Sequence, residues 1–276
     1  MAADGGRGAA VAVFLISFLE LDAIMNMRHK FRTVIGGALL AVGLVAAGNA
    51  NASVVMSGTR IIYSAQEHEV TVKLTNDGKV PAVTQVWIDN GDPDADPATI
   101  AVPFTVTPPM ARIDPGKTQT LRILYTGQPL AQDKESVFWL NLLEIPPKPG
   151  KELADTNTLS LAFRSRFKLF YRPSSLKGEA ADAPARLTWR VVRDGKSAVV
   201  EASNPTPYFV SISELELGAV GQSAAKADGA MVGPGETTRF KLTGSIPSGS
   251  DTAVRYHAIN DWGGEIEGST AIQAPQ

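Results

Sequence analysis

No cysteine occurs among the 276 residues of this chain, which excludes disulfide bonds, thiolate zinc sites and cysteine nucleophiles. The folded protein must therefore draw its stability from well-packed hydrophobic cores. An excess of one charge is missing too, because 26 Lys and Arg residues stand against 28 Asp and Glu residues. The formal net charge of -2 provides no electrostatic footprint for nucleic acid.

Motifs that carry common enzyme chemistries are also absent. The sequence has no G-x-S-x-G elbow, no Walker loop and no G-x-G-x-x-G fingerprint. His68 and His257 fall in different predicted domains and lack the spacing of metal ligands, so we interpret them as ordinary surface or core residues. Asp92, Asp94 and Asp96 alternate, but the Gly and Glu of a calcium loop are missing, which favours a solvated turn. We therefore predict no enzymatic activity, no metal and no cofactor.

The N-terminal part of the chain has the pattern of an export signal. Residues 27–52 begin with a short basic stretch, continue as an apolar run over residues 34–47, and end in A-N-A, which fits a small-x-small cleavage site. The apolar run is shorter than the ~20 residues that a membrane-spanning helix needs. We therefore predict a signal peptide with Ser53 as the first mature residue, and we interpret residues 1–26 as an upstream translation artefact.

Short segments of alternating polar and apolar residues fill the rest of the chain, with Pro, Gly and Asp between them. No apolar stripe with a period of 3.6 residues is sustained, so an α/β fold is disfavoured. Period-2 alternation with regular turns predicts an all-β fold of antiparallel sandwiches. The segments that we expect to be strands are residues 69–75, 82–88, 104–106, 120–125, 136–145, 158–171, 187–192, 198–202, 209–217, 237–242 and 254–259.

The strand pattern restarts after a stretch containing Pro, Ser and Ala, which predicts two domains. We expect a first immunoglobulin-like sandwich over residues 53–174, a linker over residues 175–184, and a second sandwich over residues 185–276. Each is near the size of such a domain, which is about 100 residues.

Five segments carry motifs that are more specific than the strand pattern. Residues 108–116 read PPMARIDPG and match P-P-x-x-R-[LI]-x-P-G, while residues 132–147 read QDKESVFWLNLLEIPP and match D-[RK]-E-S-x-[FY]-[FWY]-x-N-x-x-E-[IV]-P-P. Residues 167–173 read FKLFYRP, residues 204–208 read NPTPY and residues 259–264 read INDWGG. Together and in this order, the segments resemble those of the PapD-like family, the periplasmic pilus-assembly chaperones of the chaperone–usher pathway.

The resemblance implies two immunoglobulin-like domains in an L-shaped arrangement and a non-enzymatic function in the periplasm. Members of this family bind a pilin subunit that lacks its final strand and lend it the last strand of their own first domain, which is a form of β-strand addition. They then deliver the subunit to an outer-membrane usher. Pilin subunits and an usher are therefore the expected partners.

Leu159, Leu161 and Phe163 alternate with other residues and so share one face of the last strand predicted for the first domain. From the residues alone, this face could equally be directed into the core of the same domain. The resemblance instead implies that the three side chains belong to the donated strand. Phe163 stands where the family more often has Leu or Ile.

The resemblance also implies roles for five charged residues. Arg60 and Lys168 match two basic residues that grip the C-terminal carboxylate of the pilin, and a carboxylate shielded from water does need charged donors. Glu135, Arg172 and Asp261 match a charged trio that ties the two domains together. Taken without the resemblance, all five would be solvated surface charges.

Two alternatives remain open at this point. The chain could be a secreted two-domain surface or adhesive protein, or a secreted enzyme built on a β-sandwich, although no acid–base pair or metal site supports the second. An exposed donor strand is an aggregation hazard. Two copies of the chaperone could therefore cap each other as a homodimer while no pilin is bound.

Overall fold

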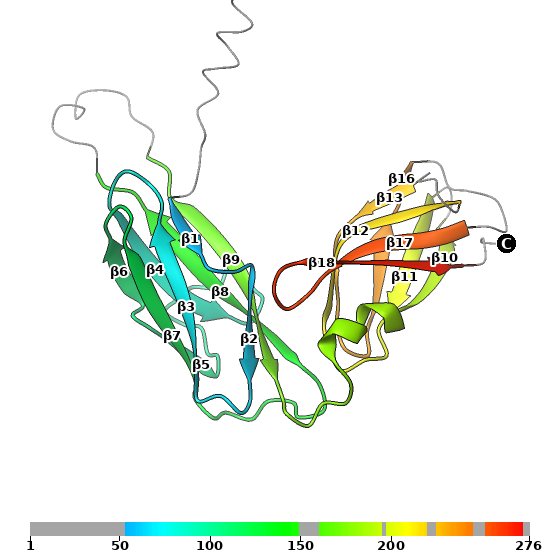
Figure 1. Cartoon of the computed structure of the whole chain (residues 1–276), viewed down its shortest axis with the longest axis horizontal. Helices are drawn as coiled ribbons and strands as arrows, with labels where there is room; N and C mark the ends of the chain where they lie inside the picture. The colour runs from blue at the N-terminus through cyan, green and yellow to red at the C-terminus, as the bar shows by residue number, and fades with distance from the viewer. Residues whose placement is uncertain (1–52, 149–159, 195–196, 220–224, 245–251, 273–276) are drawn as a thin grey trace, which may run out of the picture. The chain divides into compact units, whose positions relative to one another are not determined.

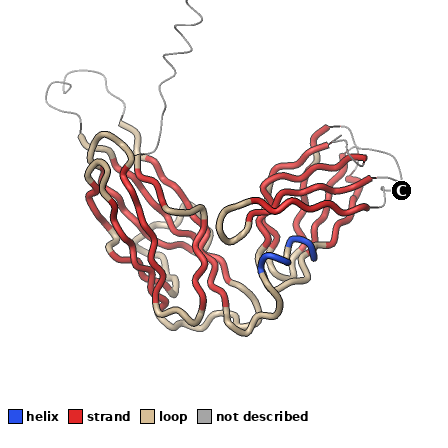
Figure 2. The backbone as a smooth tube through the Cα atoms, viewed as in Figure 1, coloured by secondary structure: helices blue, strands red, loops and turns tan. Residues whose placement is uncertain are grey.

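Strands dominate the computed structural model of this protein (Figures 1 and 2). The structure describes residues 53–148, 160–194, 197–219, 225–244 and 252–272. The predicted signal peptide and the segment before it therefore lie outside the described residues. The contacts group Ala52–Gln276 into one compact unit. No helix in the described ranges is long and apolar enough to cross a membrane.

The first half of the unit is a sandwich of two sheets, as the alternation predicts. One sheet has the strand order β1-β3-β7-β5 and the other β2-β9-β8-β4-β6. The first sheet consists of β1 (Val54–Met56), β3 (Glu69–Asn76), β7 (Thr118–Tyr125) and β5 (Phe104–Thr107). The second consists of β2 (Arg60–Ser64), β9 (Phe163–Arg172), β8 (Ser136–Ile145), β4 (Ala82–Asp89) and β6 (Met110–Ile113).

Alternating side chains from both sheets build the core of this first sandwich. In β4, buried and half-buried residues alternate along the strand from Ala82 to Ile88. Leu74 of β3, Leu140 of β8 and Leu169 of β9 are fully buried in the same cluster. The cluster fixes which face of each strand is directed inward, and hence which side chains of β9 are directed outward.

One pairing departs from the antiparallel sandwich that the sequence predicts. β2 pairs with β9 in parallel, with Arg60 opposite Lys168 and Ser64 opposite Arg172. The reason is local: the chain leaves the first sheet after β1 and enters the second sheet without reversing, with a left-handed residue at Gly58 (φ 150°) in the crossing. This crossing brings Arg60 beside Lys168.

β9 begins later than expected, at Phe163, and the described residues before it, 160–162, have no strand pairing. Its first residue pairs with Glu144 of β8, and β2 covers only the stretch from Lys168 onward. In the described part of the chain, residues 163–167 of β9 therefore pair on one side alone. Leu159 lies outside the described residues.

The second half of the unit is another sandwich, with sheets β10-β11-β15 and β16-β13-β12-β17-β18, and with β14 paired to β12. The smaller sheet consists of β10 (Thr188–Asp194), β11 (Ser197–Ser203) and β15 (Thr237–Lys241). The larger consists of β16 (Thr243–Gly244), β13 (Ala225–Asp228), β12 (Val210–Ala219), β17 (Thr252–Ile259) and β18 (Glu265–Ala271), with β14 at Met231–Val232.

Two short 3-10 helices, η2 (Ala180–Asp182) and η3 (Pro184–Arg186), lie between the sandwiches in the chain and are drawn blue in Figure 2. Ala183, between them, is buried in the second core. The hydroxyl of Tyr256 donates to the carbonyl of Pro184 at 2.8 Å. Part of the segment that we proposed as a linker thus packs on the second sandwich.

Candidate functional site

Two basic side chains from neighbouring strands form the centre of the candidate site. Arg60 begins β2, and Lys168 lies opposite it in β9. Arg60 Nη1 donates to the carbonyl of Ile259 at 2.8 Å, and Lys168 Nζ donates to Ser211 Oγ at 3.1 Å. Both side chains are half-buried, and both reach residues of the second sandwich. The structure thus brings together two residues that are 108 positions apart in the sequence.

The electrostatic environment of this cation pair is unfavourable. Burial, and then the charge of Arg60, lower the pKa of Lys168. Burial also lowers the pKa of Arg60, although Asp261 opposes the shift. Within the described residues neither cation forms a salt bridge, and Arg60 Nε is buried without a hydrogen-bond partner. The pair is therefore short of a negative charge and of an acceptor.

Aromatic rings lie beside both cations. The guanidinium of Arg60 is 6.0 Å from the ring centroid of Phe170, and Lys168 Nζ is 5.7 Å from the ring of Trp139. Ring faces attract cations at such distances, by about 0.5–1 kcal/mol at exposed sites. These contacts hold the two side chains in place but do not neutralise their charge.

The charged trio predicted from the sequence is assembled around Arg172, at the end of β9. Arg172 Nε donates to Glu135 Oε1 at 2.6 Å, and its two terminal nitrogens donate to the carboxylate of Asp261 at 2.7 and 3.0 Å. The other oxygen of Glu135 accepts the backbone N–H of Phe209 at 2.8 Å. The guanidinium is also 5.4 Å from the ring of Tyr208.

Arg172 is consequently a strongly held cation. Burial opposes its charge, but the hydrogen bonds that Arg172 donates to Asp261 and Glu135, together with the negative charges of these carboxylates, outweigh burial and raise the pKa of the guanidinium. Glu135 directly precedes β8, and Asp261 lies in the loop between β17 and β18. One arginine thereby links the two sandwiches.

Two of the three predicted donor residues lie in the described chain, and neither is in the core. Leu161 is 53% exposed and Phe163 is 43% exposed. Farther along the same face of β9, Phe167 packs against the core and Leu169 is fully buried. The apolar face of β9 therefore continues beyond the domain's own core at the start of the strand. There β9 pairs with β8 on one edge and not with β2 on the other.

The outward face of β9 holds a network that the sequence reasoning missed. Arg166 Nη2 donates to the buried carboxylate of Asp89 at 2.7 Å, and Asn141 Nδ2 donates to the same carboxylate at 2.7 Å. Arg164 Nε donates to Asn141 Oδ1 at 2.9 Å, and its guanidinium lies 5.0 Å from the ring of Trp87. The alternation of Arg164, Arg166 and Lys168 was the available signal, but nothing local indicates that Asp89 is the partner of the two arginines.

The carboxylates considered for calcium have a structural use. Asp92 Oδ1 accepts the backbone N–H of Asp94, and Asp96 Oδ1 accepts that of Ala98, each at 2.9 Å, so these side chains close turns. Among the residues that the structure describes, no group of three or more His, Asp or Glu side chains could hold a metal ion.

The chain is similar to known proteins along both sandwiches. Residues 53–177 match the family described as "Pili and flagellar-assembly chaperone, PapD N-terminal domain", and residues 182–270 match "Pili assembly chaperone PapD, C-terminal domain". The probable fimbrial chaperone YadV of Escherichia coli (strain K12) is 44% identical over 223 residues, which cover 80% of this chain and 90% of that protein. The chaperone protein FimB/FhaD of Bordetella pertussis (strain Tohama I) is 44% identical over 249 residues, or 88% of this chain and 98% of that protein.

A solved structure shows the same relationship. A chain of the complex of the Salmonella enterica SafA pilin with the SafB chaperone superposes with a TM-score of 0.66 at 25% identity, covering 82% of this chain and 99% of that chain. The motifs, the two sandwiches and the relatives agree with one another. The chain belongs to the PapD-like family of pilus-assembly chaperones, which are not enzymes.

Proposed function

We propose that this chain is a periplasmic chaperone that binds pilin subunits, stabilises them with the start of β9, and delivers them to an outer-membrane usher. The observation that carries the proposal is the half-buried cation pair of Arg60 and Lys168, which has no carboxylate partner in the described residues. The SafA–SafB complex among the similar structures supports pilin as the partner class.

The C-terminal carboxylate of a subunit supplies what the cation pair lacks. A carboxylate offers two oxygens, and Lys168, whose ammonium group has three N–H donors, makes one hydrogen bond among the described residues, to Ser211. Its negative charge offsets the repulsion between Arg60 and Lys168 in a partly dry environment, where charge-assisted hydrogen bonds are strong. The chain terminus of a bound subunit is thereby fixed against β2 and β9.

The free edge at the start of β9 is suited to backbone pairing with the same subunit. Residues 163–167 pair with β8 alone in the described chain, and the side chains of Leu161 and Phe163 are exposed beside that edge. A subunit that lacks a strand gains ladder hydrogen bonds from the edge and apolar contacts from the side chains. We assign Leu159 to the same donated segment on the basis of its spacing, although it lies outside the described residues.

The Glu135–Arg172–Asp261 trio has the role of holding the second sandwich against the first, so that both contribute to the site. In this proposal the mature protein comprises domains at residues 53–174 and 185–276 joined by residues 175–184. Residues 27–52 act as the signal that exports the chain to the periplasm.

Co-expression with a pilin from the same locus tests the proposal. The mature chain from Ser53 is expected to keep the pilin soluble and to co-purify with it, while Lys168→Ala loses the pilin and remains folded by circular dichroism. Lys117→Ala, which changes an exposed lysine outside the site, is the matched control and is expected to behave as wild type.

The possible outcomes distinguish the proposed chaperone function from the proposed carboxylate-binding site. Equal binding by wild type and Lys168→Ala would leave the chaperone function intact but contradict the assignment of the carboxylate site. If wild type retained no pilin from its own locus, the chaperone function would be refuted, and a two-domain surface or adhesive protein would become the better interpretation.

Without a subunit, the exposed edge of β9 is expected to pair with a second copy of the chain as a self-capped homodimer. Sedimentation at increasing concentration should then show a monomer–dimer equilibrium, and added pilin should return the chaperone to a one-to-one complex. A monomer at every concentration tested would rule out self-capping.

A further inference from the structure

Trp262 is the most exposed of the large apolar side chains reported for the described residues, at 92%, against 59% for Met110. It follows Asp261 in the loop between β17 and β18 and lines the same groove as Arg60. An indole is costly to leave in water unless a partner covers it, and tryptophan is enriched among residues that dominate binding energies. Its exposure therefore calls for an explanation.

The loop that presents this indole is held in one conformation. Asn260 Oδ1 accepts the backbone N–H groups of Trp262 at 3.0 Å and of Gly264 at 2.9 Å, and the N–H of Asn260 donates to the carbonyl of Gly264 at 2.8 Å. Asp261 is clamped by Arg172. A loop whose backbone is already ordered loses less backbone freedom on binding, so the contacts of the side chain that it carries count more fully toward affinity.

A close approach at Gly263 fixes the loop against the first sandwich. Gly263 has a φ of +85°, and a Cβ built there would lie 2.5 Å from the hydroxyl oxygen of Thr59. Thr59 directly precedes β2, so the loop and the start of β2 form one surface. Any other residue would be strained at this positive φ and would displace the hydroxyl of Thr59.

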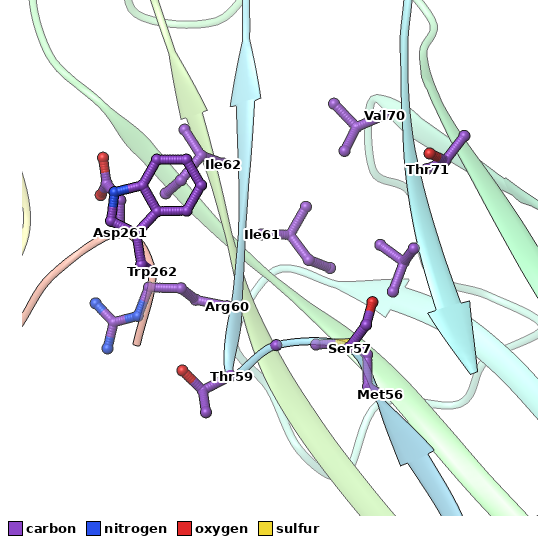
Figure 3. Close-up of a pocket in the computed structure, with 12 residues that line it drawn as sticks. Met56, Ser57, Thr59, Arg60, Ile61, Ile62, Val70, Thr71, Asp261 and Trp262 are labelled. Atoms are coloured by element: carbon purple, nitrogen blue, oxygen red, sulfur yellow. The ribbon is translucent and has the colours of Figure 1, made fainter. Parts of the chain in front are cut away.

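Beside the indole lies a groove of about 440 Å³ that runs around the free edge of β2 toward β3. Its wall is largely apolar, with Arg60 as its cation. Figure 3 shows the indole of Trp262 next to Ile62 and on the same side of β2 as Arg60, whereas Ile61 is directed toward Val70. The groove is thus continuous with the proposed carboxylate site through Arg60.

The charges around the groove restrict what it can accept. Asp261 lines it, but Arg172 already neutralises this carboxylate. Arg60 disfavours a cationic side chain by repulsion, and the apolar walls disfavour a charged side chain of either sign by desolvation. The ligand that best fits the groove is therefore an apolar or aromatic side chain attached to a negatively charged group.

We infer that the groove binds the side chain of the subunit's last residue, with Trp262 as the determinant that favours an apolar or aromatic terminus. The inference rests on the proposed function, because Arg60 and Lys168 must hold the terminal carboxylate at the mouth of the groove. An apolar last residue then packs on the indole and Ile62, while an alanine leaves the groove unfilled.

A panel of pilins with Phe, Leu, Ala or Asp as the last residue tests this inference against wild type, Trp262→Ser and Trp262→Phe chaperones. We expect Trp262→Ser to weaken binding of the Phe- and Leu-terminated pilins about tenfold and that of the Ala-terminated pilin less than twofold. Trp262→Phe should retain most of the preference. Met110→Ser, another exposed apolar residue outside the site, is the matched control and should change nothing.

A separate variant distinguishes the inference from the function on which it rests. Lys168→Ala should weaken binding of all four pilins alike, because it removes a contact with the carboxylate and not with the side chain. Equal losses for all four pilins in Trp262→Ser, or no loss at all, would overturn the inference while leaving the chaperone function intact. Failure of the wild type to bind any of the pilins would overturn both.

Discussion

Arg172→Ala is expected to lower the free energy of unfolding by about 3–5 kcal/mol, because it removes one member of a buried charge network and leaves the buried carboxylate of Glu135 without its cation. Glu135 is 3% exposed, and without Arg172 its carboxylate retains only the N–H of Phe209. Asp261, by contrast, is half-buried and can turn to solvent. Most of the loss therefore comes from the uncompensated charge on Glu135.

Urea unfolding of Arg172→Ala and wild type at neutral pH measures this effect. Arg112→Ala provides the matched control, because Arg112 and Asp114 form an ion pair with side chains 67% and 59% exposed. An exposed pair of this kind contributes about 0–1 kcal/mol. The additional substitution Glu135→Gln should recover part of the loss in Arg172→Ala. If Arg172→Ala behaved like the control, the trio would be no more than a surface feature.

Much of the fold follows from local patterns in the sequence. The alternation over residues 82–88 predicts β4 nearly to its ends, because a strand with one buried face repeats every two residues. The predicted strands at residues 198–202 and 254–259 correspond in the same way to β11 and β17. Short strands with little apolar content, such as β13 and β16, are missed, because their pairing depends on neighbours and not on their own composition.

The features that create the site are the least visible in the sequence. The crossing after β1 makes β2 parallel to β9 and places Arg60 beside Lys168, yet residues 57–59 carry only a glycine as a signal. The start of β9 is set by where β8 stops offering a partner, so alternation alone overextends the strand. The motif at residues 167–173 singles out Lys168, but a motif cannot reveal that Arg164 and Arg166 on the same strand contact Asp89.

Lys168→Met is expected to change stability and binding in opposite directions. Methionine keeps the length of the side chain but removes a half-buried charge whose pKa burial and Arg60 depress, so the free protein should become more stable at neutral pH. The same change removes the donor that we propose for the subunit's carboxylate and should weaken binding by about 2–5 kcal/mol. Such opposite effects on stability and affinity are expected where a binding site contains a charge that only the ligand neutralises.

The pH dependence of stability follows from the direction of the pKa shift. Because burial and the charge of Arg60 lower the pKa of Lys168 in the folded protein, the folded state bears the cost of the buried charge at pH values below this lowered pKa. As pH rises through the folded-state pKa toward the ordinary value, the unfolded state binds more protons, so wild type gains stability. The advantage of Lys168→Met should therefore be largest at neutral pH and vanish at alkaline pH.

Binding should respond to pH in the opposite way. A carboxylate favours protonated Lys168, so the pKa of this lysine is higher in the complex than in the free chaperone, and affinity falls as pH rises above the free-state value. The affinity of Lys168→Met should not show this decrease.

Thermal unfolding without pilin measures the stability of wild type and Lys168→Met at neutral and at alkaline pH. Titration with pilin measures their affinities at the same two pH values. Lys117→Met, at an exposed position, controls for the substitution itself. If Lys168→Met were less stable than wild type at neutral pH, the contacts of Lys168 with Trp139 and Ser211 would outweigh its burial, and the charge would be structural. The expected gain in stability together with lost binding would instead mean that the folded protein maintains an unneutralised cation until a subunit's carboxylate arrives.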